Sequence, residues 1–205
     1  QNGKIRLERY WDLSLKQNKL SAEEASEEFK SRFIDSVKLH MRADTPVGAC
    51  LSGGLDSSAI CSSIGQLYPN LDFNTFTIYY GGKDEVDERP WANKVHRDYP
   101  SLKSHDYCPQ GDELLEEFEK FFDHFEVPPA GSSPLSQYFV MKLAKSQGMK
   151  VLLDGQGADE FLAGYDHSFY RLAAGKLRKG HFGGFVSELE AFQKLRPRSS
   201  GAHLG

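Results

Sequence analysis

A loop of small residues with one carboxylate is the first part of the sequence that could do chemistry. It reads Ser-Gly-Gly-Leu-Asp-Ser-Ser over residues 52–58 and directly follows the apolar stretch 47–51. Two adjacent glycines let the backbone turn with its N–H groups pointing inward, and a helix beginning at the serines would complete a cradle for phosphate. Asp56 would repel bare phosphate, so a divalent cation, with Mg²⁺ the expected ion, has to bridge the two. The loop therefore predicts nucleotide chemistry.

Two common nucleotide motifs do not describe this loop. No Gly-Lys-Ser/Thr follows at the spacing of a Walker A sequence, and the loop does not read Gly-x-Gly-x-x-Gly. A plain Gly/Ser turn between a strand and a helix remains the alternative interpretation. The seven specified positions, placed between an apolar stretch and a helix, favour the phosphate cradle.

A second loop of glycines and acids occurs much later in the chain. Residues 154–160 read Asp-Gly-Gln-Gly-Ala-Asp-Glu and directly follow another apolar stretch. We expect Asp159 and Asp56 to hold one Mg²⁺ between them, and Gly155 and Gly157 to let the backbone approach a nucleotide closely. The alternative is a helix N-terminus whose acids only complement the helix dipole.

The rest of the chain supplies the elements that would position these loops. Apolar periodicity and turn residues predict strands over residues 47–51, 73–80, 103–107 and 150–153, and helices over 21–41, 57–68, 88–99, 112–125, 133–146, 169–177 and 185–195. Parallel neighbouring strands need helical crossovers, so this alternation predicts a doubly wound, mostly parallel α/β sheet, Rossmann-like, with helices on both faces. Ligands of such sheets bind at the carboxyl ends of the strands, so both loops should meet at one crevice.

One predicted helix carries an unusually apolar face. This face carries Leu114, Leu115, Phe118, Phe121, Phe122 and Phe125, and we expect its phenylalanines to lie in the core.

Composition bounds the class of protein. The 205 residues suit one domain with appended helices, and 25 Lys and Arg against 29 Asp and Glu give no basic surface for nucleic acid. The three cysteines are scattered without a Cys-x-x-Cys pair, which predicts packing residues in a reducing cytoplasm rather than disulfides or a zinc site. No apolar stretch reaches the roughly 20 residues of a membrane span, so no membrane partner is expected.

The motifs together resemble the synthetase domain of glutamine-dependent asparagine synthetases. Asp87-Glu88 ahead of a helix and Ser133-Pro134 at the start of another accompany the two loops. The first loop is shared more widely with ATP pyrophosphatases. The second, read through to Gly164-Tyr165, narrows the resemblance to the asparagine synthetase group, which includes relatives that make β-lactams or close peptide rings. The resemblance covers residues 20–175.

The resemblance implies a reaction and assigns roles to residues. ATP would adenylate the side-chain carboxylate of aspartate with loss of pyrophosphate, and ammonia would attack the adenylate to give asparagine and AMP. Mg²⁺ would offset the charge on the departing pyrophosphate. The implied ligands of pyrophosphate lie in the first loop: Ser52, Gly53, Gly54, Ser57 and Ser58.

Further roles come from the same resemblance. It assigns Mg²⁺ to Asp56 and Asp159, and the adenine and ribose pocket to Leu51 and Ile78. Asp154-Gly155 match the nucleotide contact after the fourth strand.

Two positions of the second loop depart from the commoner family pattern. The family has serine where this chain has Asp154, and glutamate where it has Gln156. That glutamate is thought to assist proton transfer when ammonia attacks, and an amide neither accepts nor releases a proton near neutral pH. Gln156 has two interpretations. It is a tolerated variant at a catalytic position, in which case Asp154 is a candidate for the base, or it indicates a different reaction.

The resemblance also shapes the expected partners and domains. We expect a linker over residues 1–20 from a missing N-terminal domain, the ATP-binding synthetase domain over 21–175, and a truncated helical extension with a disordered tail over 176–205. Ammonia would come from a glutaminase domain that this chain does not contain, and a homodimer is expected by analogy. The alternatives are an adenylating ligase that acts on another acid and a degenerate nucleotide-binding module without turnover.

Overall fold

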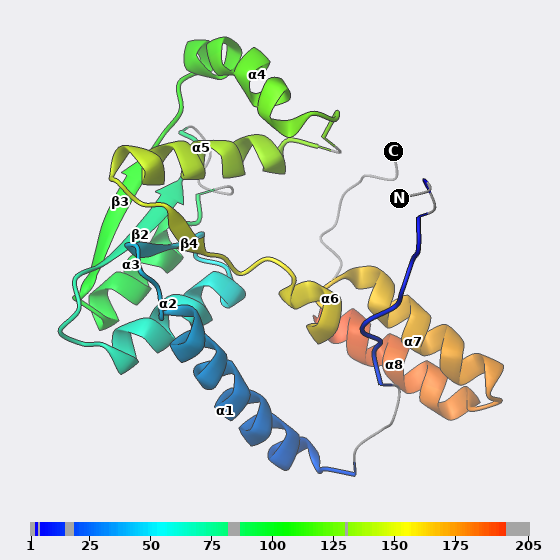
Figure 1. Cartoon of the computed structure of the whole chain (residues 1–205). Helices are drawn as coiled ribbons and strands as arrows, with labels where there is room; N and C mark the ends of the chain where they lie inside the picture. Colours follow the sequence, from blue (N-terminus) through cyan, green and yellow to red (C-terminus); the bar gives the residue numbers. More distant parts are fainter. Residues whose placement is uncertain (1–2, 4, 15–18, 82–86, 130, 196–205) are drawn as a thin grey trace. The chain divides into compact units, whose positions relative to one another are not determined.

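The computed structural model describes residues 3, 5–14, 19–81, 87–129 and 131–195 (Figure 1). The chain divides into two compact units, Gln1–Arg42 and Ala43–Gly205. The expected tail over 196–205 lies outside the described residues. The predicted domain boundaries stay predictions.

The first unit contains one helix, α1 (Ala22–His40), where the sequence predicts it. Its N-terminus carries a capping box, because the Glu24 N–H donates to Ser21 Oγ at 3.2 Å and the Ser21 N–H donates to Glu24 Oε2 at 2.8 Å. These hydrogen bonds also hold the pKa of Glu24 below its ordinary value. The described residues before Ser21 form neither helix nor strand.

The second unit is built on a parallel sheet, which confirms the predicted fold class. Its strands are β1 (Val47–Cys50), β2 (Phe73–Ile78), β3 (Leu102–Tyr107) and β4 (Val151–Leu153). They are arranged in the order β3-β2-β1-β4, and every pair is parallel. Ala49 of β1 lies opposite Thr75 on one side and Leu153 on the other.

The second unit has seven helices in its described part, and some of them cover both faces of this sheet. They are α2 (Leu55–Leu67), α3 (Arg89–Asp98), α4 (Gly111–Phe125), α5 (Ser133–Ser146), α6 (Ala158–Leu162), α7 (Asp166–Arg178) and α8 (Phe182–Leu195). Of these, α7 and α8 pack against each other. The helix α5 packs on β2 from one face, whereas α2 contacts β1 and α3 contacts β3 from the other (Figure 1). The sequence did not predict the short α6 as an element of its own. No helix in the described part of the chain is long and apolar enough to cross a membrane.

The core under α5 positions the strand that leads into the first loop. Cys50, Phe76, Val140 and Ala144 are buried together there. A side chain at Gly48 would come within 2.8 Å of the Phe76 ring, so glycine at this position lets the ring lie close to β1. Cys50 and Cys61 are both buried, which confirms the expected packing role of these two cysteines, and their burial raises the pKa of each thiol to about 12.

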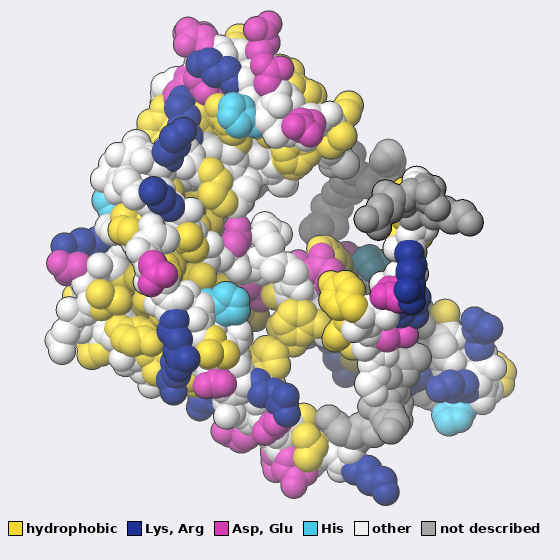
Figure 2. All heavy atoms as spheres, viewed as in Figure 1, with side chains coloured by type: hydrophobic (Ala, Val, Ile, Leu, Met, Phe, Trp, Pro, Cys, Tyr) yellow, Lys and Arg dark blue, Asp and Glu magenta, His cyan; other side chains and the backbone are white. Residues whose placement is uncertain are grey.

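The apolar face of α4 is only partly in the core, which corrects the expectation. Phe121 is buried and meets the Tyr138 ring edge-on at 5.8 Å, but Leu115 is 76% exposed, Phe118 47% and Phe125 41%. Figure 2 shows apolar side chains reaching the surface along α4, beside acidic ones. The reason is geometric, because the described chain covers α4 on one side only, whereas its aromatic residues spread over a wider arc.

A carboxylate, Glu117, ties α4 to α5. It accepts hydrogen bonds from Lys120 Nζ at 2.8 Å and the Tyr138 hydroxyl at 2.7 Å, and lies 3.3 Å from Lys142 Nζ. These partners, Lys120 first, lower the pKa of Glu117 to about 2. A carboxyl group whose pKa is depressed on folding stabilises the fold above its unfolded pKa and loses that contribution as the pH falls through the folded value.

The attachment of α4 should therefore weaken with acid. We expect the melting temperature to fall as the pH drops from 4.5 towards 2, and Glu117→Gln to flatten that part of the profile. Calorimetric scans at several pH values measure this, with Glu116→Gln on the exposed side of α4 as the matched control. Parallel acid profiles for Glu117→Gln and the unchanged protein would contradict the assignment.

Candidate nucleotide site

The strand order creates one place where a ligand crevice is expected. From β1 the chain proceeds outward to β2 and β3 on one side, and it returns on the other side of β1 to form β4. The carboxyl ends of β1 and β4 therefore flank the topological switch point, where open α/β sheets bind their ligands. Both loops singled out in the sequence begin where these two strands end.

The two loops are in contact with each other. A side chain at Gly155 would come within 2.9 Å of both Asp56 Cβ and the Ser57 backbone nitrogen. Only glycine allows the second loop to lie so close to the start of α2. The predicted meeting of the loops at one end of the sheet is confirmed.

The first loop is held in shape by its own hydroxyl groups. The Ser52 N–H donates to Ser57 Oγ at 3.2 Å, the Gly54 N–H donates to Ser52 Oγ at 3.2 Å, and the two serine hydroxyls are 3.0 Å apart. Gly53 has a φ of 90°, and a Cβ there would lie 2.6 Å from the Glu88 carbonyl oxygen. The loop thus combines a left-handed turn with a close approach to the start of α3.

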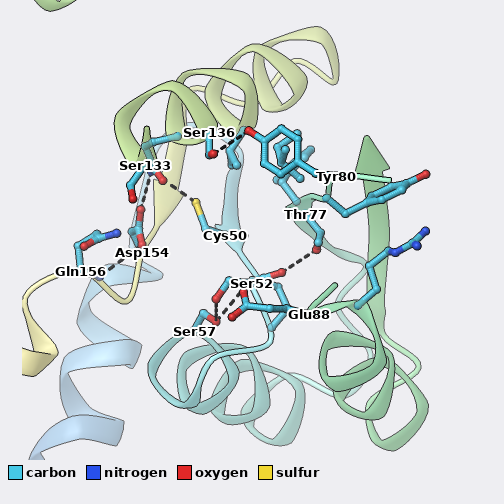
Figure 3. A pocket seen from close by; sticks show the side chains of 17 residues that line it. Cys50, Ser52, Ser57, Thr77, Tyr80, Glu88, Ser133, Ser136, Asp154 and Gln156 are labelled. Carbon is cyan, nitrogen blue, oxygen red and sulfur yellow. Dashed lines mark hydrogen bonds between the residues drawn. The ribbon is translucent and has the colours of Figure 1, made fainter. Parts of the chain in front are cut away.

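A cavity of about 540 Å³ opens beside the first loop (Figure 3). Six predicted site residues line it: Leu51, Ser52, Ser57, Ile78, Asp154 and Gln156. The other predicted site residues lie outside its lining: Gly53, Gly54, Asp56, Ser58, Gly155 and Asp159. The cavity wall therefore joins apolar residues at the carboxyl ends of β1 and β2 to polar residues of both loops.

The two predicted magnesium ligands occupy helix starts. Asp56 is in the first turn of α2 and Asp159 in the first turn of α6. A side chain at Gly164 would collide with the Asp159 carboxylate, so Gly164 leaves room for this carboxylate to fold back over the turn. Within the described ranges, no group of three or more His, Cys, Asp or Glu side chains could hold a metal ion.

A nucleotide-bound Mg²⁺ needs fewer protein ligands than a site built from protein side chains alone. This ion usually keeps several water ligands and binds one or two carboxylates together with substrate phosphates. Gly155 lies close to Asp56, so the second loop reaches the residue that carries the first of the two predicted magnesium ligands. Carboxylate oxygens are suitable ligands for Mg²⁺. The Asp159 carboxylate lies against Gly164 in this structure, and the roles of Asp56 and Asp159 stay predictions.

Asp154 is anchored from two directions. Gln137 Nε2 donates to Asp154 Oδ2 at 2.6 Å, and the Gln156 N–H donates to Asp154 Oδ1 at 3.3 Å. Gln137 Nε2 also lies 4.0 Å from the Cys50 sulfur. In Figure 3 the Asp154 and Gln156 side chains come from one loop and face the cavity beside Ser133.

Arg89 supplies a cation at the cavity wall that is already paired. It forms a 2.6 Å ion pair with Asp87, and its guanidinium lies 3.6 Å from the centre of the Tyr79 ring. The hydrogen bonds from Arg89 lower the pKa of Asp87.

Several cavity residues were not singled out as site residues by the sequence argument. The helix α5 contributes Ser133, Ser136, Gln137 and Val140. Their spacing is that of one helical face, which was the signal available in the sequence. Tyr80 fixes this face, because its hydroxyl lies 2.7 Å from Ser136 Oγ. Thr77 does the same for the first loop by donating to the Leu51 carbonyl oxygen at 2.6 Å.

Comparisons with known proteins agree with this architecture. Residues 28–204 match the family model described as asparagine synthase. The chain is 33% identical over 167 residues to asparagine synthetase [glutamine-hydrolyzing] 1 of Bacillus subtilis, which covers 80% of this chain and 25% of that protein. It is 34% identical over 161 residues to putative asparagine synthetase [glutamine-hydrolyzing] 2 of Methanocaldococcus jannaschii, and this match covers 78% of this chain and 30% of that protein. Amidase chyE of Penicillium rubens is 28% identical to the chain over 174 residues, and this match covers 77% of the chain and 26% of the amidase.

These matches determine the family but concern only part of each relative. The chain spans 25% to 30% of the length of these relatives. The family model covers most of the chain, including both loops and every described strand. The chain therefore belongs to the asparagine synthase family.

Proposed function

We propose that this chain carries the ATP-activating part of an amide-forming ligase. A carboxylate attacks the α-phosphorus of ATP, the bond to pyrophosphate breaks, and the resulting acyl adenylate is attacked by ammonia to give an amide and AMP. The observation that supports this most is the contact between the two glycine-bearing loops at the switch point, beside a cavity of about 540 Å³. A nucleotide with its phosphates at the first loop fits this arrangement.

Residues of the chain would divide the work on ATP. Backbone N–H groups at the start of α2 and the hydroxyls of Ser52 and Ser57 bind the pyrophosphate oxygens, while Leu51 and Ile78 form the apolar side of the adenine and ribose pocket. Gly53, Gly54 and Ser58 belong to the same phosphate cradle. These are the roles that the family resemblance assigns to the same residues in the sequence analysis.

The metal and the proton complete the scheme. Asp56 and Asp159 would hold Mg²⁺, which offsets the charge that gathers on departing pyrophosphate. Asp154 is the carboxylate on the cavity wall beside Gln156, and its anchoring by Gln137 keeps it there. We assign to Asp154 the proton that the attacking ammonia gives up, because the Gln156 amide cannot take it.

The identity of the acid is a separate question. The Bacillus subtilis relative is named an asparagine synthetase that hydrolyses glutamine, so aspartate is the first acid to test, with ammonia from a glutaminase domain as the proposed nitrogen source. The alternative is a related ligase acting on another acid, and the largely apolar wall of a second cavity, between α4, α5 and the second loop, favours it.

Pyrophosphate exchange tests the reaction class. We expect the full-length protein to move label from pyrophosphate into ATP only when Mg²⁺ and a carboxylate substrate are both present, because acyl adenylate formation is reversible. Product analysis should show AMP rather than ADP. Exchange should fall at least about tenfold in Asp159→Asn, the loss of about 1.4 kcal/mol of metal-dependent binding.

The same experiment separates the proposal from a degenerate module. Binding of ATP with Mg²⁺ by calorimetry, without exchange for any acid tested, would contradict the ligase and leave a nucleotide-binding module. Gly175→Ala in α7, where nothing lies near the added carbon, is the control for mutation itself.

A further inference from the structure

A second cavity of about 500 Å³ adjoins the nucleotide cavity between α4, α5 and the second loop. The two cavities share three lining residues, Ser133, Gln137 and Gln156. A group that leaves the first cavity past these residues enters the second. The shared residues therefore mark where a carboxyl group at the α-phosphate would join the remainder of its molecule.

The wall of this second cavity is largely aromatic. Phe121, Phe125 and Tyr138 contribute rings, and Pro134 and Met141 add further apolar surface. The Phe121 ring lies 5.3 Å from the Phe125 ring and 5.8 Å from the Tyr138 ring. Such rings favour another ring at their edges and faces.

The polar groups around the second cavity are mostly committed to the protein. The Tyr138 hydroxyl donates to Glu117 at 2.7 Å, His124 Nδ1 donates to the Lys120 carbonyl at 2.7 Å, and Gln137 Nε2 donates to Asp154. Among the described residues that line the second cavity, none is Asp, Glu, Lys or Arg. An ammonium or carboxylate placed there would find no ion-pair partner on the described wall.

We infer that the second cavity holds the body of the acid substrate and selects a carboxylic acid whose body is apolar and about the size of an aromatic ring. This inference rests on the proposed function. Aspartate would place both its α-ammonium and its α-carboxylate beside aromatic rings that offer neither charge an ion-pair partner. An aryl or alkyl body would instead gain from removal of its apolar surface from water.

The test compares acids in the exchange reaction. The full-length protein is assayed with ATP, Mg²⁺ and labelled pyrophosphate, and with benzoate, 3-phenylpropanoate, hexanoate or L-aspartate as the acid. We expect the best apolar acid to exceed aspartate in kcat/KM by at least about tenfold, the scale of discrimination by a hydrophobic pocket. The variant Met141→Trp, which fills the second cavity, should lower kcat/KM for that acid by at least about tenfold and leave KM for ATP unchanged.

A control variant tests whether added bulk on α5 alone affects the exchange reaction. Lys145→Trp adds the same bulk one turn further along α5, outside the cavity lining, and should change neither quantity. Exchange that is best with aspartate overturns the inference and leaves the proposed function standing. If Met141→Trp leaves the exchange rate unchanged but lowers the melting temperature, another segment of the protein fills the cavity. This outcome also overturns the inference. Exchange with none of the acids contradicts the proposed function itself.

Discussion

Replacing Gly155 by alanine should weaken ATP binding by at least about tenfold, or about 1.4 kcal/mol. The added carbon would come within 2.9 Å of Asp56 Cβ and of the Ser57 backbone nitrogen. Neither is the end of a flexible side chain, so one loop has to shift. Both loops contribute to the proposed nucleotide site, and a shift at this contact changes its shape at the phosphate end.

Titration calorimetry with ATP and Mg²⁺ measures the loss. Gly175→Ala again serves as the control, because alanine at this helical position meets nothing within 4 Å and should stabilise α7 slightly. A thermal melt shows whether Gly155→Ala is still folded, which separates a changed site from a damaged protein. Unchanged ATP affinity in a folded Gly155→Ala protein would place the nucleotide elsewhere.

The second large effect is expected at Asp56. Asp56→Asn keeps the size of the side chain and removes the charge that the proposed Mg²⁺ requires. The affinity for ATP in the presence of Mg²⁺ should fall at least about tenfold, whereas the weak binding of ATP in EDTA should stay the same or improve, because Asp56 then no longer repels phosphate.

The comparison with and without metal is what makes this experiment specific. A general disturbance of the loop would lower both affinities together. An equal loss in magnesium and in EDTA would therefore contradict a metal role for Asp56, even if the variant binds ATP poorly. Gln66→Ala, at an exposed position near the end of α2 and outside the cavity lining, provides a control for small changes in this helix.

Local patterns were sufficient to predict most of the fold. The capping box at Ser21, the apolar strands and the glycine-bounded helices are short-range signals, and β1 to β4 and the major helices lie where these signals place them. Tertiary context decides what such signals cannot. Leu115 and Phe118 look like core residues by periodicity, but the described chain leaves them exposed because α4 is covered from one side.

The candidate site shows the same division. The two loops were found from residue type and spacing, and their meeting was expected from the rule that ligands of parallel sheets bind at the carboxyl ends of the strands. Gln137 could not be found in this way, because an amide in the middle of a helix has no motif, and its importance comes from a 2.6 Å hydrogen bond to Asp154 across 17 residues of sequence. The second cavity was also invisible, since it forms only when α4, α5 and the second loop are placed together.

The strand order gives the two loops unequal mechanical support. The loop that begins at Ser52 leaves β1, which is bonded on both sides, whereas the loop that begins at Asp154 leaves β4, a three-residue strand at the border of the described sheet. In the proposed function, the loop assigned to phosphate therefore follows a strand that is paired on both sides, and the loop assigned to the acid follows a strand that is paired on one side. Asp154 and Gln156, the two departures from the family pattern, lie in the second of these loops and outside β4, so a substitution at either position would leave the strand pairing of the central β1 untouched.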